Sequence, residues 1–296
     1  MKKSRVGVGK VISWIIGGGF LFFLLIFLVS LYIAREGPGA GKIGLINIEG
    51  VILDSKETLA QLDRYQKNQT IKALVIRINS PGGGVAAAQE IFEELQKTKS
   101  QHRKPIVASM GSLAASGGYY VACASDRIFA NPGSITGSIG VIVQLANISG
   151  LLEKVGVKSV TIKSGEHKDM GSMTKDLSPE DQKIFQGVLD DMHDQFIDVV
   201  AKSRRMNKEK VREISDGRIF TGRQAISLGL IDELGDLSDA VNCAAQMAGI
   251  KGKPRIVEER KRVFSLLELL GSKIFSFPAS PPDAGWPTFC VQYLMH

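Results

Sequence analysis

The stretch Lys72–Asn79, which reads Lys-Ala-Leu-Val-Ile-Arg-Ile-Asn, decides the fold class. Its nearly continuous Leu, Val and Ile residues are typical of a strand that a parallel sheet buries on both faces. Strands are also predicted at Lys42–Glu49 and Pro105–Met110, and helices at Ser55–Asn68 and Val85–Ser100. This strand–helix–strand order predicts a right-handed α/β fold with a parallel sheet and flanking helices.

Local signals refine these elements. Ser55 is expected to cap its helix, and Ile91, Phe92 and Leu95 are expected to face the core. Ser178-Pro179 followed by two acids predicts the start of a helix that runs to about Met206. The remaining predictions are a short helix at Ser116–Ser125, further strands at Ile139–Val143 and Ser159–Lys163, and a strand–turn–helix at Gly217–Ala225.

The N-terminus has the pattern of a membrane anchor. Four cationic and no acidic residues occupy positions 1–10, and Val11–Ala34 then runs for 24 residues without a charge. A helix of that length spans about 36 Å, enough to cross a bilayer. A cleaved signal peptide is the rival interpretation, but its apolar region is shorter and ends in a small-residue cleavage site, which Tyr32-Ile33-Ala34 does not match. We therefore expect a single-pass helix in the inner (cytoplasmic) membrane, with a cytoplasmic N-terminus and with the domain that follows the helix outside the cytoplasm.

Five segments follow from these patterns: a cytoplasmic N-terminus at 1–10, the anchor at 11–34, a linker at 35–41, one domain at 42–250 and a partly disordered tail at 251–296. The tail includes a Pro-rich run at 278–287, which argues against a packed element there. It could reach a neighbouring copy or occupy a groove.

Composition excludes several classes. Three Cys (Cys123, Cys243 and Cys290) without a Cys-x-x-Cys pair exclude a disulfide scaffold and a structural zinc site, and they favour free thiols. The net charge of +7 is concentrated at the N-terminus, and no basic stripe with interleaved aromatics follows, so no nucleic-acid partner is expected. No motif calls for a cofactor or a metal.

Gly-rich turns are where the chemistry is expected. Gly82-Gly83-Gly84 follows the buried strand and lacks both the phosphate-loop Lys and dinucleotide-binding spacing, which leaves an oxyanion-binding turn or a plain tight turn. Ser116 opens a helix just before Gly117 and Gly118, which would expose its hydroxyl as a nucleophile or make it only a helix cap.

A serine nucleophile needs a base. Of the four His residues only His167 lies in a plausible loop, and its neighbour Lys168 offers a different base. A lysine amine has an ordinary pKa of ~10.4, which burial lowers by several units.

The ordered motifs Ser-Pro-Gly-Gly-Gly (80–84), Ala-Ala-Ser-Gly-Gly-Tyr-Tyr (114–120), Ser-Ile-Thr-Gly-Ser-Ile-Gly-Val (134–141), Ser-Gly-Glu-His-Lys-Asp (164–169) and Gly-Arg-Ile-Phe-Thr-Gly (217–222) resemble the signal peptide peptidase A family. The resemblance covers residues 42–240 and the anchor. It implies the short, single-domain form of membrane-anchored serine proteases with a Clp-protease/crotonase-like fold.

The resemblance also implies a Ser/Lys dyad. Ser116 matches the nucleophile, Lys168 the general base and Ser138 the serine that orients the Lys amine, while Gly83 and Gly117 match the oxyanion donors. The implied substrates are cleaved signal peptides and similar apolar unfolded peptides, and the implied partners are membrane lipid around the anchor and further copies in a homo-oligomeric ring.

Three alternatives stay open at this point. A crotonase-like acyl-CoA enzyme also uses paired backbone N–H groups but needs neither Ser116 nor Lys168. A catalytically silent membrane scaffold would tolerate Ser116→Ala. A Ser/His protease would use His167 in place of Lys168.

Overall fold

The computed structural model describes residues 8–35, 41–259 and 292–294. Helix α1 (Val8–Arg35) is a continuous helix, with side chains described over residues 17–30. Within these described residues, no helix is found that is both long and apolar enough to cross a membrane.

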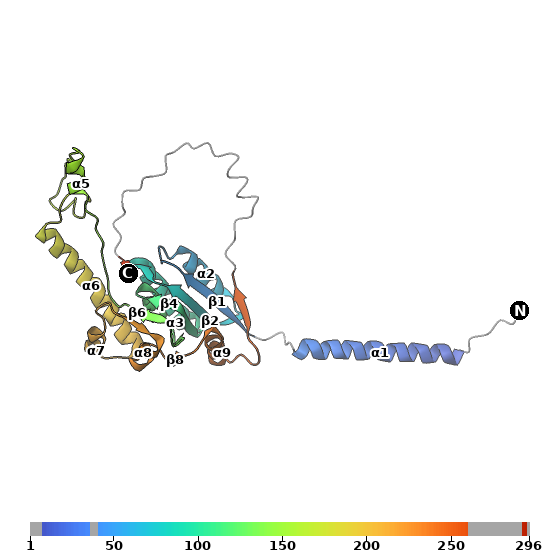
Figure 1. Ribbon diagram of the computed structural model, residues 1–296. Helices are drawn as coiled ribbons and strands as arrows, with labels where there is room; N and C mark the ends of the chain where they lie inside the picture. Colours follow the sequence, from blue (N-terminus) through green and yellow to red (C-terminus); the bar gives the residue numbers. More distant parts are fainter. Residues whose placement is uncertain (1–7, 36–40, 260–291, 295–296) are drawn as a thin grey trace, which may run out of the picture.

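The centre of the molecule is a sheet of eight strands in the order β7-β6-β4-β2-β1-β9, with β5 beside β4 and β8 beside β5. The strand pairs are parallel except β6 with β7. The strands are β1 (Lys42–Glu49), β2 (Ile71–Ser80), β4 (Ile106–Ala115), β5 (Arg127–Ala130), β6 (Ile135–Gly137), β7 (Ile219–Thr221), β8 (Glu233–Leu234) and β9 (Arg255–Glu258). The predicted mostly parallel α/β sheet is confirmed (Figure 1).

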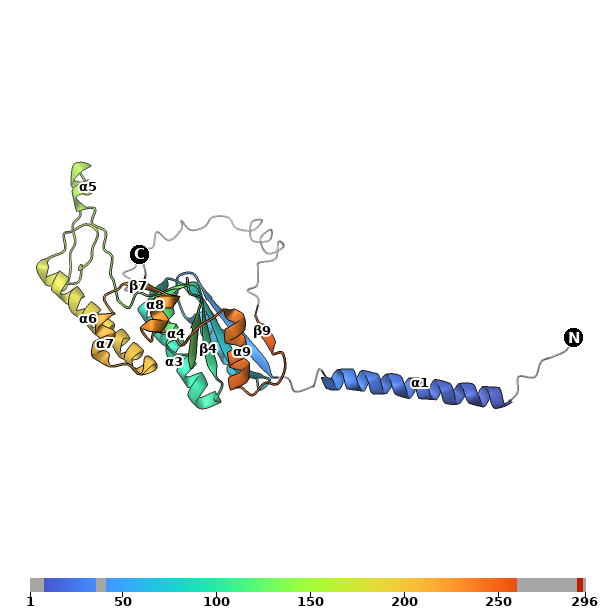
Figure 2. The same cartoon turned by 60° about the horizontal axis from the view of Figure 1, so that its bottom comes forward.

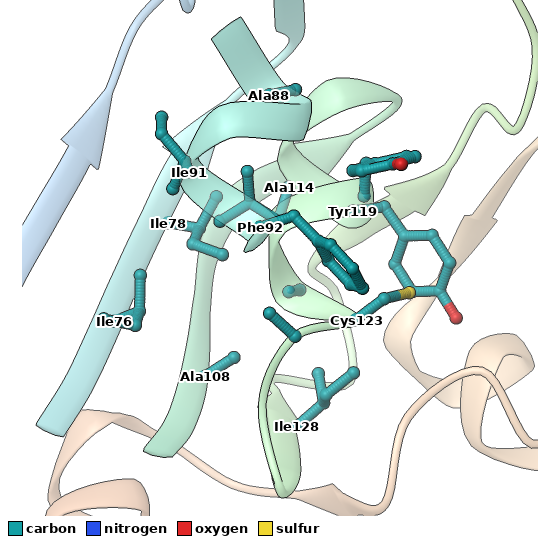
Figure 3. Packing of buried hydrophobic residues seen from close by; sticks show 14 of the residues in the cluster. Ile76, Ile78, Ala88, Ile91, Phe92, Ala108, Ala114, Tyr119, Cys123 and Ile128 are labelled. Atoms are coloured by element: carbon teal, nitrogen blue, oxygen red, sulfur yellow. The ribbon is translucent and has the colours of Figure 1, made fainter. Parts of the chain in front are cut away.

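Both faces of the sheet are covered, as the continuous apolar run in β2 predicts. Leu74, Ile76 and Ile78 belong to the larger core, whereas Ala73 and Val75 pack on the opposite side against α9 (Leu237–Met247). The larger core lies under α2 (Lys56–Lys67), α3 (Val85–His102), α4 (Gly117–Ala122) and α6 (Pro179–Arg204). Figure 3 shows Ile91 of α3 beside Ile78 of β2, and Phe92 of α3 pointing toward Tyr119 of α4 and toward Cys123, which directly follows α4.

The remaining elements are α5 (Ser149–Lys154), α7 (Lys208–Glu213) and α8 (Gly222–Ser227), with a two-stranded pair of β3 (Gly82–Gly84) and β10 (Gln292–Leu294). The predicted helix start at Ser178-Pro179 is confirmed, since the Ser178 hydroxyl accepts the Asp181 N–H at 3.0 Å. β9 pairs with β1, so the expected domain boundary at residue 250 falls before the last strand of the sheet.

Three local predictions are wrong. Ser55 stands at the N-cap of α2 but makes no capping bond, because its hydroxyl donates to the Glu90 carboxylate of α3. Ile139–Val143 and Ser159–Lys163 form no strands. Val160 and Ile162 are 77% and 96% exposed, so the second segment has a strand pattern but no partner strand in the described chain.

The segment 141–178, called the arm below, leaves the sheet after β6 and returns at α6. It carries α5, and in both Figure 1 and Figure 2 it lies beyond the N-terminal end of α6, away from the sheet. Seven of its apolar side chains are exposed: Leu145, Leu151, Val155, Val157, Val160, Ile162 and Leu177.

Candidate functional site

Ser116 stands at the junction where β4 ends and α4 begins. It is fully buried. Its backbone has φ 52° and ψ −118°, and a residue other than glycine adopts such a positive φ only at a cost of ~1–3 kcal/mol. Its N–H donates to the Gly137 carbonyl at 2.8 Å. Its Oγ makes no hydrogen bond with any described residue. The fold therefore holds a free hydroxyl in a strained turn, and Ser116 does not act as a helix cap.

Ser138 is brought beside Ser116 by strand register. Ala115 of β4 pairs with Gly137 of β6, and each serine directly follows its paired residue. Ser138 also has a positive φ, of 50°, is buried, and donates its N–H to the Arg218 carbonyl at 2.8 Å. The two serines thus leave the same edge of the sheet in neighbouring turns.

The Gly-rich turn lies at this edge as well, because Ser80 of β2 pairs with Ala114 of β4. Gly83 forms a parallel bridge with Ile52. A Cβ on Gly83 would lie 2.2 Å from the Ile52 carbonyl oxygen, which explains why this position holds glycine.

The outer edge of the Gly-rich strand is occupied by an extended segment. β10 pairs antiparallel with β3, with Tyr293 opposite Gly83, and it also contacts α4. The Gly84 N–H and the Gly82 carbonyl both bond to Ile52 on the inner side. Because peptide groups alternate along a strand, the Gly83 N–H faces β10. This edge of the site therefore binds peptide backbone.

A cavity of about 720 Å³ opens beside Ser138, between the start of the arm, α6 and the turn before β7. Val141, Leu189 and Ile219 line it with apolar surface, and His193 and Arg218 add polar groups. The Nε2 atom of His193 is buried and has no hydrogen-bond partner among the described residues.

The structure does not join Lys168 to the serines. Lys168 is exposed on the arm, and its side chain makes no hydrogen bond or ion pair with a described residue. Its neighbour His167 hydrogen-bonds through Nδ1 to Asp181 at 2.9 Å, which raises the pKa of the His167 imidazole. Four of the five residues proposed from sequence, Gly83, Ser116, Gly117 and Ser138, thus gather at one sheet edge, and Lys168 stands apart from them.

Sequence reasoning missed two features of this region. The sequence predicts Asp181 as a first-turn acid of α6, but it does not predict the hydrogen bond between Asp181 and His167. The expectation that the tail could occupy a groove did not locate the pairing of residues 292–294 with the Gly-rich strand, since three residues carry no usable periodicity.

Comparisons with known proteins identify the family of the chain. The sequence profile of peptidase family S49 matches residues 98–251, and that of the Clp protease family matches residues 48–134. A Synechocystis protein described as a protease is 44% identical over 210 residues, covering 71% of this chain and 75% of that protein. The Enterococcus faecium protein named as signal peptide peptidase SppA is 41% identical over 221 residues, covering 70% of this chain and 64% of that protein.

Protease 4 of Salmonella typhi is 37% identical over 220 residues, covering 71% of this chain but only 35% of that protein. Among solved structures, a ClpP1 mutant from Listeria monocytogenes has 17% identity and a TM-score of 0.46, covering 66% of this chain and 93% of that one.

A Clp-protease-like α/β fold and these relatives define a serine protease. The chain belongs to peptidase family S49, with SppA and protease 4 among its homologues.

Proposed function

We propose that this chain is a membrane-anchored endopeptidase that cleaves signal-peptide remnants and similar apolar, unfolded peptides with Ser116 as nucleophile and Lys168 as general base. The observation that supports the proposal best is the pairing of peptide backbone with the strand edge at Gly83. There, an extended segment lies antiparallel along the Gly-rich strand and beside the helix that Ser116 opens. A peptide substrate would add to the same edge by backbone hydrogen bonds.

The chemistry follows from these groups. The neutral Lys168 amine takes the Ser116 Oγ proton, and Oγ attacks the peptide carbonyl. The Gly83 and Gly117 N–H groups hold the oxyanion that forms, and Ser138 holds the lysine amine. The lysine ammonium gives its proton to the departing amine as the C–N bond breaks, and water then hydrolyses the acyl-enzyme. No cofactor takes part in this sequence.

Apolar substrates fit the cavity beside Ser138, which Val141, Leu189 and Ile219 line. A peptide side chain that enters this cavity removes apolar surface from water, at about 25 cal/mol per Å². Most extended segments of a folded protein are already paired within its own sheets, so unfolded peptides are the substrates we propose.

The dyad is proposed to form between copies of the chain in a homo-oligomeric ring. In the single chain, the arm, which includes Lys168, lies away from the sheet (Figure 1), and no other described segment covers its exposed apolar side chains. Contact between the arm of one copy and the sheet edge of the next would cover this surface and bring in the base.

Co-expression of two inactive variants tests this arrangement. Ser116→Ala and Lys168→Ala chains each lack one member of the dyad. A site that takes Ser116 and Lys168 from different copies regains about one quarter of the wild-type activity after random mixing. A dyad within one copy regains none. If Lys168→Ala alone stays active, the proposed base is wrong.

The uncharged run 11–34 is proposed as the anchor in the inner membrane. All described side chains of α1, at residues 17–30, are exposed, and none is charged. The cationic flank at 1–10 favours a cytoplasmic N-terminus, which places residues 42–250 outside the cytoplasm. Added protease should therefore digest the catalytic domain in spheroplasts; protection until the membrane is lysed would contradict this topology.

A further inference from the structure

The turn that carries Lys168 is held on both sides of that residue. His167 Nδ1 lies 2.9 Å from Asp181 Oδ1. On the other side, the Asp169 carboxylate accepts from Lys163 Nζ at 2.7 Å and from Lys175 Nζ at 2.9 Å. Lys175 also reaches Asp181 Oδ2 at 3.3 Å. Both chain neighbours of Lys168 thus belong to one network of charges.

Asp181 connects this network to the core. Its side chain is only 3% exposed, and it lies in the first turn of α6. Phe196, Ile197 and Val200 of the same helix are fully buried in the larger core. Because α6 is packed into the core, its first turn can hold the turn around Lys168 in a fixed position.

The same network keeps acids away from the Lys168 amine. The carboxylates of Asp169 and Asp181 are already paired with other cations, namely Lys163, Lys175 and His167. An ion pair between Lys168 and either acid would stabilise the protonated amine, which cannot act as a base. Lys168 makes no such pair within the described residues.

We propose that Asp181 is a positioning residue, which fixes the turn through His167 and Lys175 so that Lys168 is presented free of acidic partners to Ser116. This inference rests on the proposed function, in which Lys168 is the base.

The charges agree with this role. The hydrogen bond from His167 is the largest influence that lowers the pKa of Asp181, to about 2, and Ser178 and Lys175 lower it further. The pKa of His167 is raised by Asp181 first and then by Glu180 and Glu166, which also face it. The pair is therefore ionic below the ordinary histidine pKa of about 6.5, and its charge is lost as the pH rises through the raised value.

The test uses full-length protein in phospholipid nanodiscs and an apolar fluorogenic peptide. Asp181→Asn removes the charge at nearly constant size. We expect kcat to fall roughly ten- to a hundredfold with KM within about twofold, because a loosened turn misplaces the base but leaves the peptide edge intact. The loss should be greatest where His167 is protonated and should shrink as the pH rises through the raised pKa of His167, because the wild-type pair is no longer ionic there.

Asp194→Asn is the matched control, because Asp194 lies on the same helix and also pairs with two cations, Lys208 and Arg212, but outside this network. Its kcat and pH profile should equal those of wild type. Two substitutions of His167 separate positioning from folding. His167→Asn keeps a donor near the Nδ1 position and should retain kcat within about threefold, whereas His167→Phe should lose activity like Asp181→Asn.

The outcomes are distinct. If Lys168→Ala abolishes cleavage while Asp181→Asn keeps the wild-type kcat and pH profile, the positioning role is wrong and the dyad stands. A uniform loss at every pH, with a lowered melting temperature, would show a purely structural role and overturn the inference. If Lys168→Ala remains active, the proposed function fails and the inference fails with it.

Discussion

Substitution of Gly83 by Ala gives a sharp test of the peptide-binding edge. The added Cβ would lie 2.2 Å from the Ile52 carbonyl oxygen and 2.6 Å from the Ile52 nitrogen, both backbone atoms that cannot rotate away. To restore an ordinary contact of 3.4 Å, the strand must move by roughly 1.2 Å. A shift of that size at an oxyanion donor should lower kcat/KM about 10²- to 10³-fold.

Gly84→Ala is the matched control for this prediction. Its Cβ would meet no atom nearer than the Ile52 carbonyl oxygen at 3.6 Å, and its φ of −57° suits alanine. The assay is cleavage of an apolar peptide, with melting curves to confirm equal folding. We expect Gly84→Ala to stay within about threefold of wild type. Equal activity of Gly83→Ala and wild type would refute the assignment of Gly83 to the site.

Two further predictions concern the C-terminal strand and the core. Removal of residues 292–296 should raise kcat/KM for short peptides about three- to tenfold, because β10 competes for the edge of β3; unchanged kinetics would contradict this competition. Asp232→Asn should lower the free energy of unfolding by about 3 kcal/mol, because the Arg204 guanidinium, only 9% exposed, loses a bidentate partner at 2.9 and 3.0 Å. Chemical denaturation measures this change, and a loss under about 1 kcal/mol would show that the pair behaves as a surface ion pair.

The sheet could be predicted because its signals are local. The nearly continuous apolar sequence of β2 by itself indicates a strand that is buried on both faces. Ser178-Pro179 likewise indicates the start of α6 to within a few residues. The motif around Ser116 predicted the strand-to-helix junction, and the register of β4 with β6 then brought in Ser138. These elements depend little on distant parts of the chain.

The arm could not be predicted, because its residues depend on partners outside their own segment. Ser159–Lys163 has the alternation of a strand, yet no edge within the described chain accepts it. Ser55 has the sequence of a cap, but the Glu90 carboxylate competes successfully for its hydroxyl. The His167–Asp181 pair joins residues 14 positions apart, a separation that no helical or strand period predicts.

The separation of nucleophile and base has a physical consequence under the proposed mechanism. The backbone conformation and the strand register fix Ser116 within one folded copy. Lys168 lies on an exposed arm, and we propose that Asp181 of α6 holds the turn around it through His167 and Lys175. A single copy then holds a buried hydroxyl without a base, and hydrolysis begins only when a second copy supplies one. Because this completion is bimolecular, specific activity should fall on dilution below the dissociation constant of the assembly and return on concentration. An enzyme with Ser116 and Lys168 joined in one copy would keep its specific activity at every dilution.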